Sequence, residues 1–207
     1  MTRENQRKVK ELNGLMQQTV KKIAKAHSLK SKQSTVYTKT NDMFYEMSFT
    51  TGFNERVSDF ILDCSIWIKP LWTDDLLWDI LKCSENKMKS VSLRAEGAFT
   101  FRGLKAHQCS QELSDLSVCK IETHVMSSIE RFLEYKISCD TKYFYEHSEE
   151  IVYQEELYAL LLFIHNEEYI NAIEFTDTMT NDYFIIGNKG VRQLAVEYCE
   201  KACGNIQ

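Results

Sequence analysis

The amino-acid sequence predicts an α+β protein. Runs that alternate apolar and polar residues occupy much of positions 34–70, whereas apolar residues spaced three and four apart dominate from about position 108 onward. One proline and seven glycines among 207 residues disfavour long linkers and a turn-rich all-β sandwich. We expect an N-terminal helix, an antiparallel sheet of three to four strands, and a C-terminal group of four to five helices. The predicted domains are an α+β sheet domain over 1–104 and a helical region over 105–207, packed on the sheet as one globular unit.

The first predicted elements are a helix over residues 4–27 and a β-hairpin. Apolar residues of the helix keep spacings of three and four and form one stripe. Gly14 inside this stretch weakens the helix by up to ~1 kcal/mol relative to alanine, which a well-packed helix tolerates. Two alternating runs, 34–39 and 43–51, then flank the turn-forming residues 40–42, and this arrangement predicts the hairpin.

The central strand of the sheet is predicted over residues 57–70. Five apolar side chains share one parity, and therefore one face: Phe60, Leu62, Cys64, Ile66 and Ile68. The other face combines Asp63, Ser65 and Lys69 with Ile61 and Trp67. Burial contributes roughly 1.5–3 kcal/mol for each large apolar side chain, so this strand can anchor a core. Pro70 cannot donate to a ladder and ends the strand.

After this strand the sequence predicts one more helix, one more strand and then helices only. Thr73 is expected to cap a helix whose first turn carries Asp74 and Asp75. A fourth strand is predicted near 98–102, where Phe99 and Phe101 are in phase. Further helices are predicted from about 108 to 135, over 153–165 and 167–179 as an αα-hairpin, and after Asn188.

Cysteine usage and hydropathy indicate a reducing, cytoplasmic compartment. The seven cysteines are odd in number and form no Cys-x-x-Cys motif, and the first eight residues are charged and polar where a signal segment would be apolar. The longest apolar run, 157–164, is far shorter than the roughly 20 residues that a membrane-spanning helix needs. We therefore expect no membrane association.

The net charge of −5 is divided unevenly along the chain. Residues 1–33 hold nine Lys or Arg against two Glu, a net of +7, which leaves −12 for the remainder. A basic first helix suits a nucleic acid or an acidic partner, with Lys21, Lys22 and Lys25 as contacts. The same charges also suit a solvated helix face that lies near the acidic half of the protein itself. The aromatic residues gather away from these lysines, which disfavours nucleic acid as the partner.

The first 80 residues or so resemble a known family. An opening helix is followed by Leu29-Lys30-Ser31-Lys32, by Thr35-Val-Tyr37, and by Asp42-Met-Phe44 leading into alternating strands and a helix. This order resembles the small bacterial domains grouped as domain of unknown function 4304. The resemblance implies a bacterial protein with a related fold, and the family carries no established chemistry.

Motifs for catalysis, cofactors and metals are missing from the sequence. No Gly-x-Ser-x-Gly elbow and no phosphate-binding glycine loop occurs. Cys199 with Cys203, and His107 with Cys109, are close pairs, but a zinc site needs four well-placed ligands. We interpret these cysteines as buried or half-buried thiols, and we expect no metal, no cofactor and no catalytic residue. An enzyme with a dispersed site, of a hydrolase or nuclease-like kind, stays an alternative, and its candidates are His107, His124 and Glu96.

The sequence favours a non-catalytic binding protein with an acidic, tyrosine-rich face. Tyrosines supply rigid contact area and carboxylates steer a cationic partner. The predicted contact residues for a basic protein partner are Tyr145, Glu146, Glu149, Glu150, Tyr153, Glu155 and Glu156. One version of this function is an inhibitor or immunity-type protein that masks a basic toxin. The structural alternative is a helical surface with half-buried tyrosines and solvated glutamates.

Overall fold

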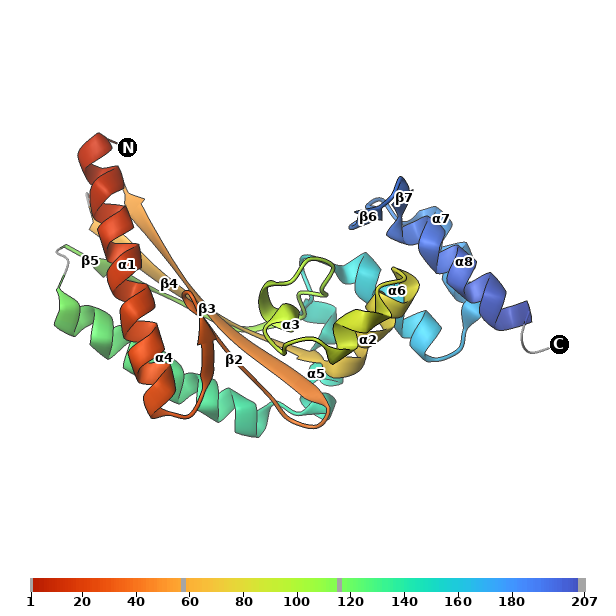
Figure 1. Cartoon of the computed structure of the whole chain (residues 1–207), viewed down its shortest axis with the longest axis horizontal. Helices are drawn as coiled ribbons and strands as arrows, with labels where there is room; N and C mark the ends of the chain where they lie inside the picture. The colour runs from red at the N-terminus through yellow and green to blue at the C-terminus, as the bar shows by residue number, and fades with distance from the viewer. Residues whose placement is uncertain (1, 57–58, 115–116, 205–207) are drawn as a thin grey trace. The chain divides into compact units, whose positions relative to one another are not determined.

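The structure is a computed structural model that describes residues 2–56, 59–114 and 117–204 (Figure 1). The chain forms two compact units, and each unit is built from two separate segments. Unit 1 comprises Met1–Ile68 and Leu104–Glu146, and unit 2 comprises Lys69–Gly103 and His147–Gln207. These units differ from the division at residue 104 expected from the sequence, because residues 105–146 belong with the sheet.

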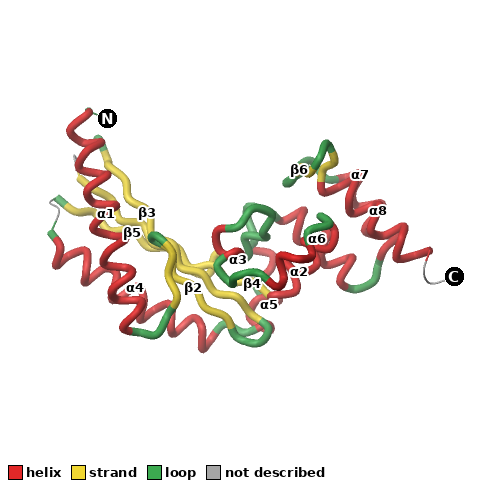
Figure 2. The backbone as a smooth tube through the Cα atoms, in the orientation of Figure 1, coloured by secondary structure: helices red, strands yellow, loops and turns green. Residues whose placement is uncertain are grey.

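Unit 1 contains a five-stranded antiparallel sheet in the order β1-β2-β3-β4-β5. Figure 2 draws its strands in yellow. The strands are β1 (Lys30–Lys32), β2 (Thr35–Lys39), β3 (Met43–Asn54), β4 (Asp59–Pro70) and β5 (Leu104–Leu113). The α+β class is confirmed, but the sheet has five strands where three to four were expected. Within the unit, α1 (Arg3–Ala26) packs on β3 and on α4 (Val118–Ser138), and α5 (Thr141–Glu146) follows α4.

The predicted hairpin and the apolar face of the central strand are confirmed. Lys39 of β2 faces Phe44 of β3 across the turn, where the Met43 N–H donates to the Thr40 hydroxyl at 3.1 Å. The five β4 side chains of the predicted apolar face are buried, each with no more than 6% of its surface exposed. Residues 57–58, predicted to begin this strand, lie outside the described residues.

Two predicted elements are wrong in position. The fourth strand expected near 98–102 does not form there, and the strand that pairs with β4 is β5, which begins at Leu104. The helix expected from about 108 begins only at Val118, because residues 108–113 belong to β5. Thr73 is not the helix cap, since Pro70 occupies that position and the Thr73 hydroxyl donates to the Pro70 carbonyl at 2.7 Å.

Unit 2 is mainly helical. Its helices are α2 (Leu71–Ile80), the 3-10 helix η1 (Ser84–Met88), α3 (Leu93–Glu96), the 3-10 helix η2 (Ser148–Glu150), α6 (Glu155–His165), α7 (Tyr169–Thr178) and α8 (Val191–Gly204). A small hairpin of β6 (Ile185–Ile186) and β7 (Lys189–Gly190) precedes α8. The core of this unit includes Trp78, Phe101, Leu157, Leu161 and Leu194.

No described helix combines the length and the apolar character needed to cross a membrane.

Candidate partner-binding surface

A short segment of unit 2 exposes two large side chains between carboxylates. Val152 and Tyr153, which lie between η2 and α6, have 63% and 60% of their surface exposed. Glu149 and Glu150 on η2 and Glu155 at the start of α6 are exposed on either side of them. We call these five residues the acidic edge.

The backbone of the acidic edge is held in place by its neighbours. Ile151, at its centre, has only 4% of its surface exposed and anchors the segment in the core. Gln154, the residue before α6, accepts a hydrogen bond from the Arg102 backbone N–H at 2.6 Å through its side-chain oxygen. The Gln154 carbonyl also accepts from the Tyr158 N–H at 2.8 Å. The exposed side chains therefore project from a fixed backbone, which lowers the entropy lost on binding.

Glu156, one of the predicted contact residues, has a role inside unit 2. Its carboxylate accepts hydrogen bonds from the Thr180 N–H at 3.0 Å, from the Thr180 hydroxyl at 2.9 Å and from the Asn181 N–H at 3.2 Å. The Thr180 backbone bond, the largest cause, and the bonds that accompany it lower the pKa of Glu156. Glu156 thus fastens the segment after α7 to α6, and we leave it out of the acidic edge.

Tyr145 and Glu146, the other two predicted contacts outside the edge, belong to unit 1. Both are exposed on α5, where the Tyr145 ring meets Phe144 edge-on at 6.0 Å between centroids. Glu146 forms an ion pair with Lys142 at 3.7 Å on the same helix. The seven predicted residues are therefore divided between two units, and four of them lie in the acidic edge.

A buried group of charges in unit 2 escaped the sequence analysis. Lys69, with 2% of its surface exposed, donates to the fully buried Asp74 carboxylate at 2.9 Å and to the carbonyl oxygens of Arg94 and Phe101. Asp74 also accepts from the Phe101 N–H at 2.9 Å. The guanidinium of Arg94 pairs with Asp75 at 2.6 Å and lies over the Trp78 ring. Burial raises the pKa of Asp74, and the two cations oppose that rise.

These contacts join parts of unit 2 to one another. They fix residues 94–101, which contain three of the four residues of α3 and no strand, to the start of α2. A buried carboxylate that is paired with a lysine and hydrogen-bonded to backbone has its desolvation cost offset by these partners.

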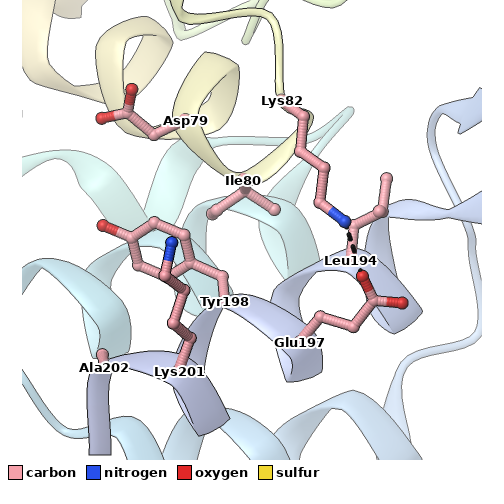
Figure 3. A pocket seen from close by; sticks show the side chains of 8 residues that line it. All are labelled: Asp79, Ile80, Lys82, Leu194, Glu197, Tyr198, Lys201 and Ala202. Atoms are coloured by element: carbon pink, nitrogen blue, oxygen red, sulfur yellow. Dashed lines mark hydrogen bonds and ion pairs between the residues drawn. The ribbon is translucent and has the colours of Figure 1, made fainter. Parts of the chain in front are cut away.

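One pocket of unit 2 lies between α2 and α8 (Figure 3). It has a volume of about 540 Å³ and is lined by Asp79, Ile80, Lys82, Leu194, Glu197, Tyr198, Lys201 and Ala202. Both carboxylates already have partners: Glu197 pairs with Lys82 at 2.7 Å and with Lys189, and Asp79 pairs with Lys87 at 2.5 Å. Tyr198 and Lys201, both from α8, complete its polar lining.

Another pocket lies in unit 1, between the β4–β5 pair and α4. It has a volume of about 250 Å³, and Cys64, His107, Cys109, Ser128 and Arg131 are among its lining residues. Burial, with the nearby Arg131 charge as the lesser cause, lowers the pKa of His107.

His107 and His124, two of the three candidates for a dispersed active site, do not meet in this pocket. His107 lines it, but His124 packs its ring edge-on against Phe49 at 6.1 Å between centroids. Burial is the main cause that lowers the pKa of His124, and the Asp63 charge opposes it. Glu96 belongs to α3 of unit 2, and its side chain lies outside the described atoms.

The basic first helix makes an ion pair within its own unit. Lys22 of α1 contacts Glu122 of α4 at 2.8 Å, and the buried stripe of α1 includes Leu12, Met16, Val20 and Ile23. Lys21 and Lys25 are exposed. This arrangement agrees with a solvated helix face whose charges lie near acidic residues of the same protein.

Among the side chains that the structure describes, no group of three or more His, Cys, Asp or Glu is placed to hold a metal ion.

No family model, curated protein or solved structure matches the chain.

Proposed function

We propose that the protein is a non-catalytic interaction protein whose acidic edge binds a basic protein partner. The observation that carries this proposal is the exposure of Val152 and Tyr153 between the carboxylates of Glu149, Glu150 and Glu155. An aromatic anchor surrounded by charge is the usual composition of an interface hot spot with its rim. The carboxylates attract a cationic surface, and the tyrosine ring then fills an apolar recess on it.

The partner that fits this edge carries arginine or lysine around an apolar depression. Exposed charge pairs contribute little affinity individually, so the carboxylates mainly speed the encounter and fix its orientation. The affinity comes from burial of Tyr153 and Val152, which the fixed backbone presents without further ordering. An inhibitor or immunity-type protein that masks a basic surface would act in this way.

The test measures binding to a fluorescent arginine-rich peptide with a central leucine, by anisotropy at low and high salt. Tyr153→Ala should weaken binding more than about fivefold, the loss expected for an aromatic hot spot. The triple variant Glu149→Gln, Glu150→Gln and Glu155→Gln should weaken binding several-fold at low salt and less at high salt, because salt screens exposed charges.

The matched control removes the same charge from another exposed surface of unit 2. Its substitutions are Glu174→Gln and Asp177→Asn on α7 and Glu200→Gln on α8. The proposal predicts near-normal peptide binding by this control. If the two triple variants weaken binding equally and Tyr153→Ala has no effect, peptide binding depends only on the net charge of the protein. That result would contradict the proposal.

A further inference from the structure

Two cysteines lie directly opposite each other on neighbouring strands of unit 1. Cys64 of β4 and Cys109 of β5 are register partners in an antiparallel ladder. Opposed residues in such a ladder have Cα atoms about 4.5 or 5.5 Å apart, depending on the type of pair. Both distances fall within the range of roughly 4.4–6.8 Å that a disulfide requires. The two thiols also interact with each other, and both are free thiols in the structure.

Of the two cysteines, only Cys109 is accessible to solvent. Cys64 has 1% of its surface exposed, whereas Cys109 is partly exposed, and both line the pocket of about 250 Å³. Arg131 and His107 line the same pocket. The Arg131 guanidinium attracts an oxidant that carries carboxylates, and the small volume admits the sulfur end of such a molecule.

The difference in burial assigns different roles to the two sulfurs. The thiolate is the nucleophile in thiol–disulfide exchange, and burial raises the pKa of Cys64 to about 12. Cys64 is therefore a poor first attacker. Its thiol does accept a hydrogen bond from the Ser128 hydroxyl, which lowers that pKa in part and stabilises the thiolate when a second step needs it.

We propose that Cys64 and Cys109 form a dithiol site that reacts with low-molecular-weight disulfides of the glutathione type and closes to a Cys64–Cys109 disulfide. In the first step the Cys109 thiolate attacks one sulfur of oxidised glutathione. A mixed disulfide forms on Cys109, and one glutathione leaves as its thiolate. In the second step Cys64 loses its proton to solvent and attacks the Cys109 sulfur of the mixed disulfide. The Cys64–Cys109 bond forms, and the second glutathione leaves as its thiolate. Two protein thiols are oxidised and one small disulfide is reduced to two thiols, so atoms and electrons balance.

The test incubates the reduced, folded full chain with oxidised glutathione, blocks the remaining thiols by alkylation, and analyses intact and digested protein by mass spectrometry. The expected product has lost two hydrogen atoms and yields one peptide pair crosslinked between Cys64 and Cys109. Cys64→Ala should stop the reaction at a glutathione adduct on Cys109. Cys109→Ser should prevent both products, and it places the hydroxyl at the partly exposed position, where the fold tolerates it best.

Cys119→Ser is the matched control, because Cys119 is exposed at the start of α4 and outside this pocket. It should leave the crosslink unchanged. A stable adduct on Cys109 in the unmodified chain, with no crosslink to Cys64, would overturn the proposal. Crosslinking that appears only after unfolding in denaturant would overturn it too, because the reaction would then not depend on the strand register.

Discussion

Lys69, near the end of β4, is held by partners from two other elements. The alternation along β4 placed Phe60, Leu62, Cys64, Ile66 and Ile68 on the buried face, and all five are buried. The same alternation placed Lys69 on the mixed face, yet it is one of the most buried charged residues. Its partners, Asp74 and Arg94, come from α2 and α3. Residue periodicity describes one strand, and it carries no information on partners that another element supplies.

Removal of the Lys69 charge should destabilise the protein strongly. Lys69→Met leaves the Asp74 carboxylate buried with less compensation, and the loss of one partner of a buried pair costs about 3–5 kcal/mol. Urea unfolding followed by circular dichroism measures this change. Lys87→Ala is the control, because it breaks the half-exposed ion pair with Asp79, which contributes about 0–1 kcal/mol. Similar losses in the two variants would contradict the stabilising role of the buried group.

The hydrogen bonds of Glu156 predict a specific response to acid. Because its folded-state pKa is lowered below the ordinary value of 4.5, the folded state binds fewer protons there than the unfolded state. The stability that Glu156 contributes is therefore present above that value and is lost as the pH falls through the lower, folded-state pKa. Glu156→Gln should unfold at lower urea concentration than the unmodified chain at neutral pH. The difference should shrink in acid, and a constant difference across the titration would contradict this account.

The candidate site could be predicted only in part, for a reason that also concerns single residues. Glu149, Glu150, Tyr153 and Glu155 are exposed, in agreement with a solvated acidic stretch. Glu156 is the next carboxylate along the chain, but backbone N–H groups from residues 180 and 181 bind it. Hydrogen bonds from a segment that is distant in the sequence cannot be predicted from the local composition around Glu156.

At the scale of elements, β5 escaped prediction because its ends alone are buried. Leu104 and Leu113 each have 1% of their surface exposed, and the residues between them are partly or fully exposed. Such a strand shows little apolar alternation, and only its pairing with β4 defines it. The three-residue strand β1 is too short to give a periodic signal. The long amphipathic helix α1, by contrast, lies within one residue of its predicted bounds.

Two glycines in different elements should respond oppositely to the same substitution. A Cβ added at Gly14 of α1 meets nothing within 4 Å, so Gly14→Ala should stabilise the helix by about 0.5–1 kcal/mol. A Cβ at Gly190 of β7 would lie 1.5 Å from an Asp182 carboxylate oxygen. Gly190→Ala should displace that carboxylate, which accepts from the Arg192 N–H, and cost about 1 kcal/mol.

Thermal unfolding of both glycine variants beside the unmodified chain measures the two shifts. The midpoint should rise for Gly14→Ala and fall for Gly190→Ala. Equal shifts in one direction would show that alanine acts through the unfolded chain, where it reduces flexibility at both sites, and would contradict the local explanation.

At the scale of the whole molecule, unit 1 should fold without unit 2 if its two segments are joined directly. Ile68 of β4 and Leu104 of β5 are register partners, so a two-residue Asn-Gly turn can connect them as a hairpin. The chain 1–68 joined by this turn to 104–146 should unfold cooperatively in urea. Fragment 1–104 should not, because it lacks α4, whose Ile121, Val125, Ile129 and Phe132 are fully buried. Cooperative unfolding of fragment 1–104 would contradict this division.

The segmented construction of the two units has a consequence during synthesis on the ribosome. Unit 1 cannot be completed before residue 146 has emerged, and by then residues 69–103 have already been made. These residues include α2, which carries the buried Leu77 and Trp78 and packs on α6 and α8 of 147–207. At roughly 5–20 residues per second, translation of that last segment takes several seconds. During this interval, after unit 1 folds and before unit 2 folds, each nascent chain therefore exposes these apolar side chains. Chaperones should bind the nascent chain mainly in this interval.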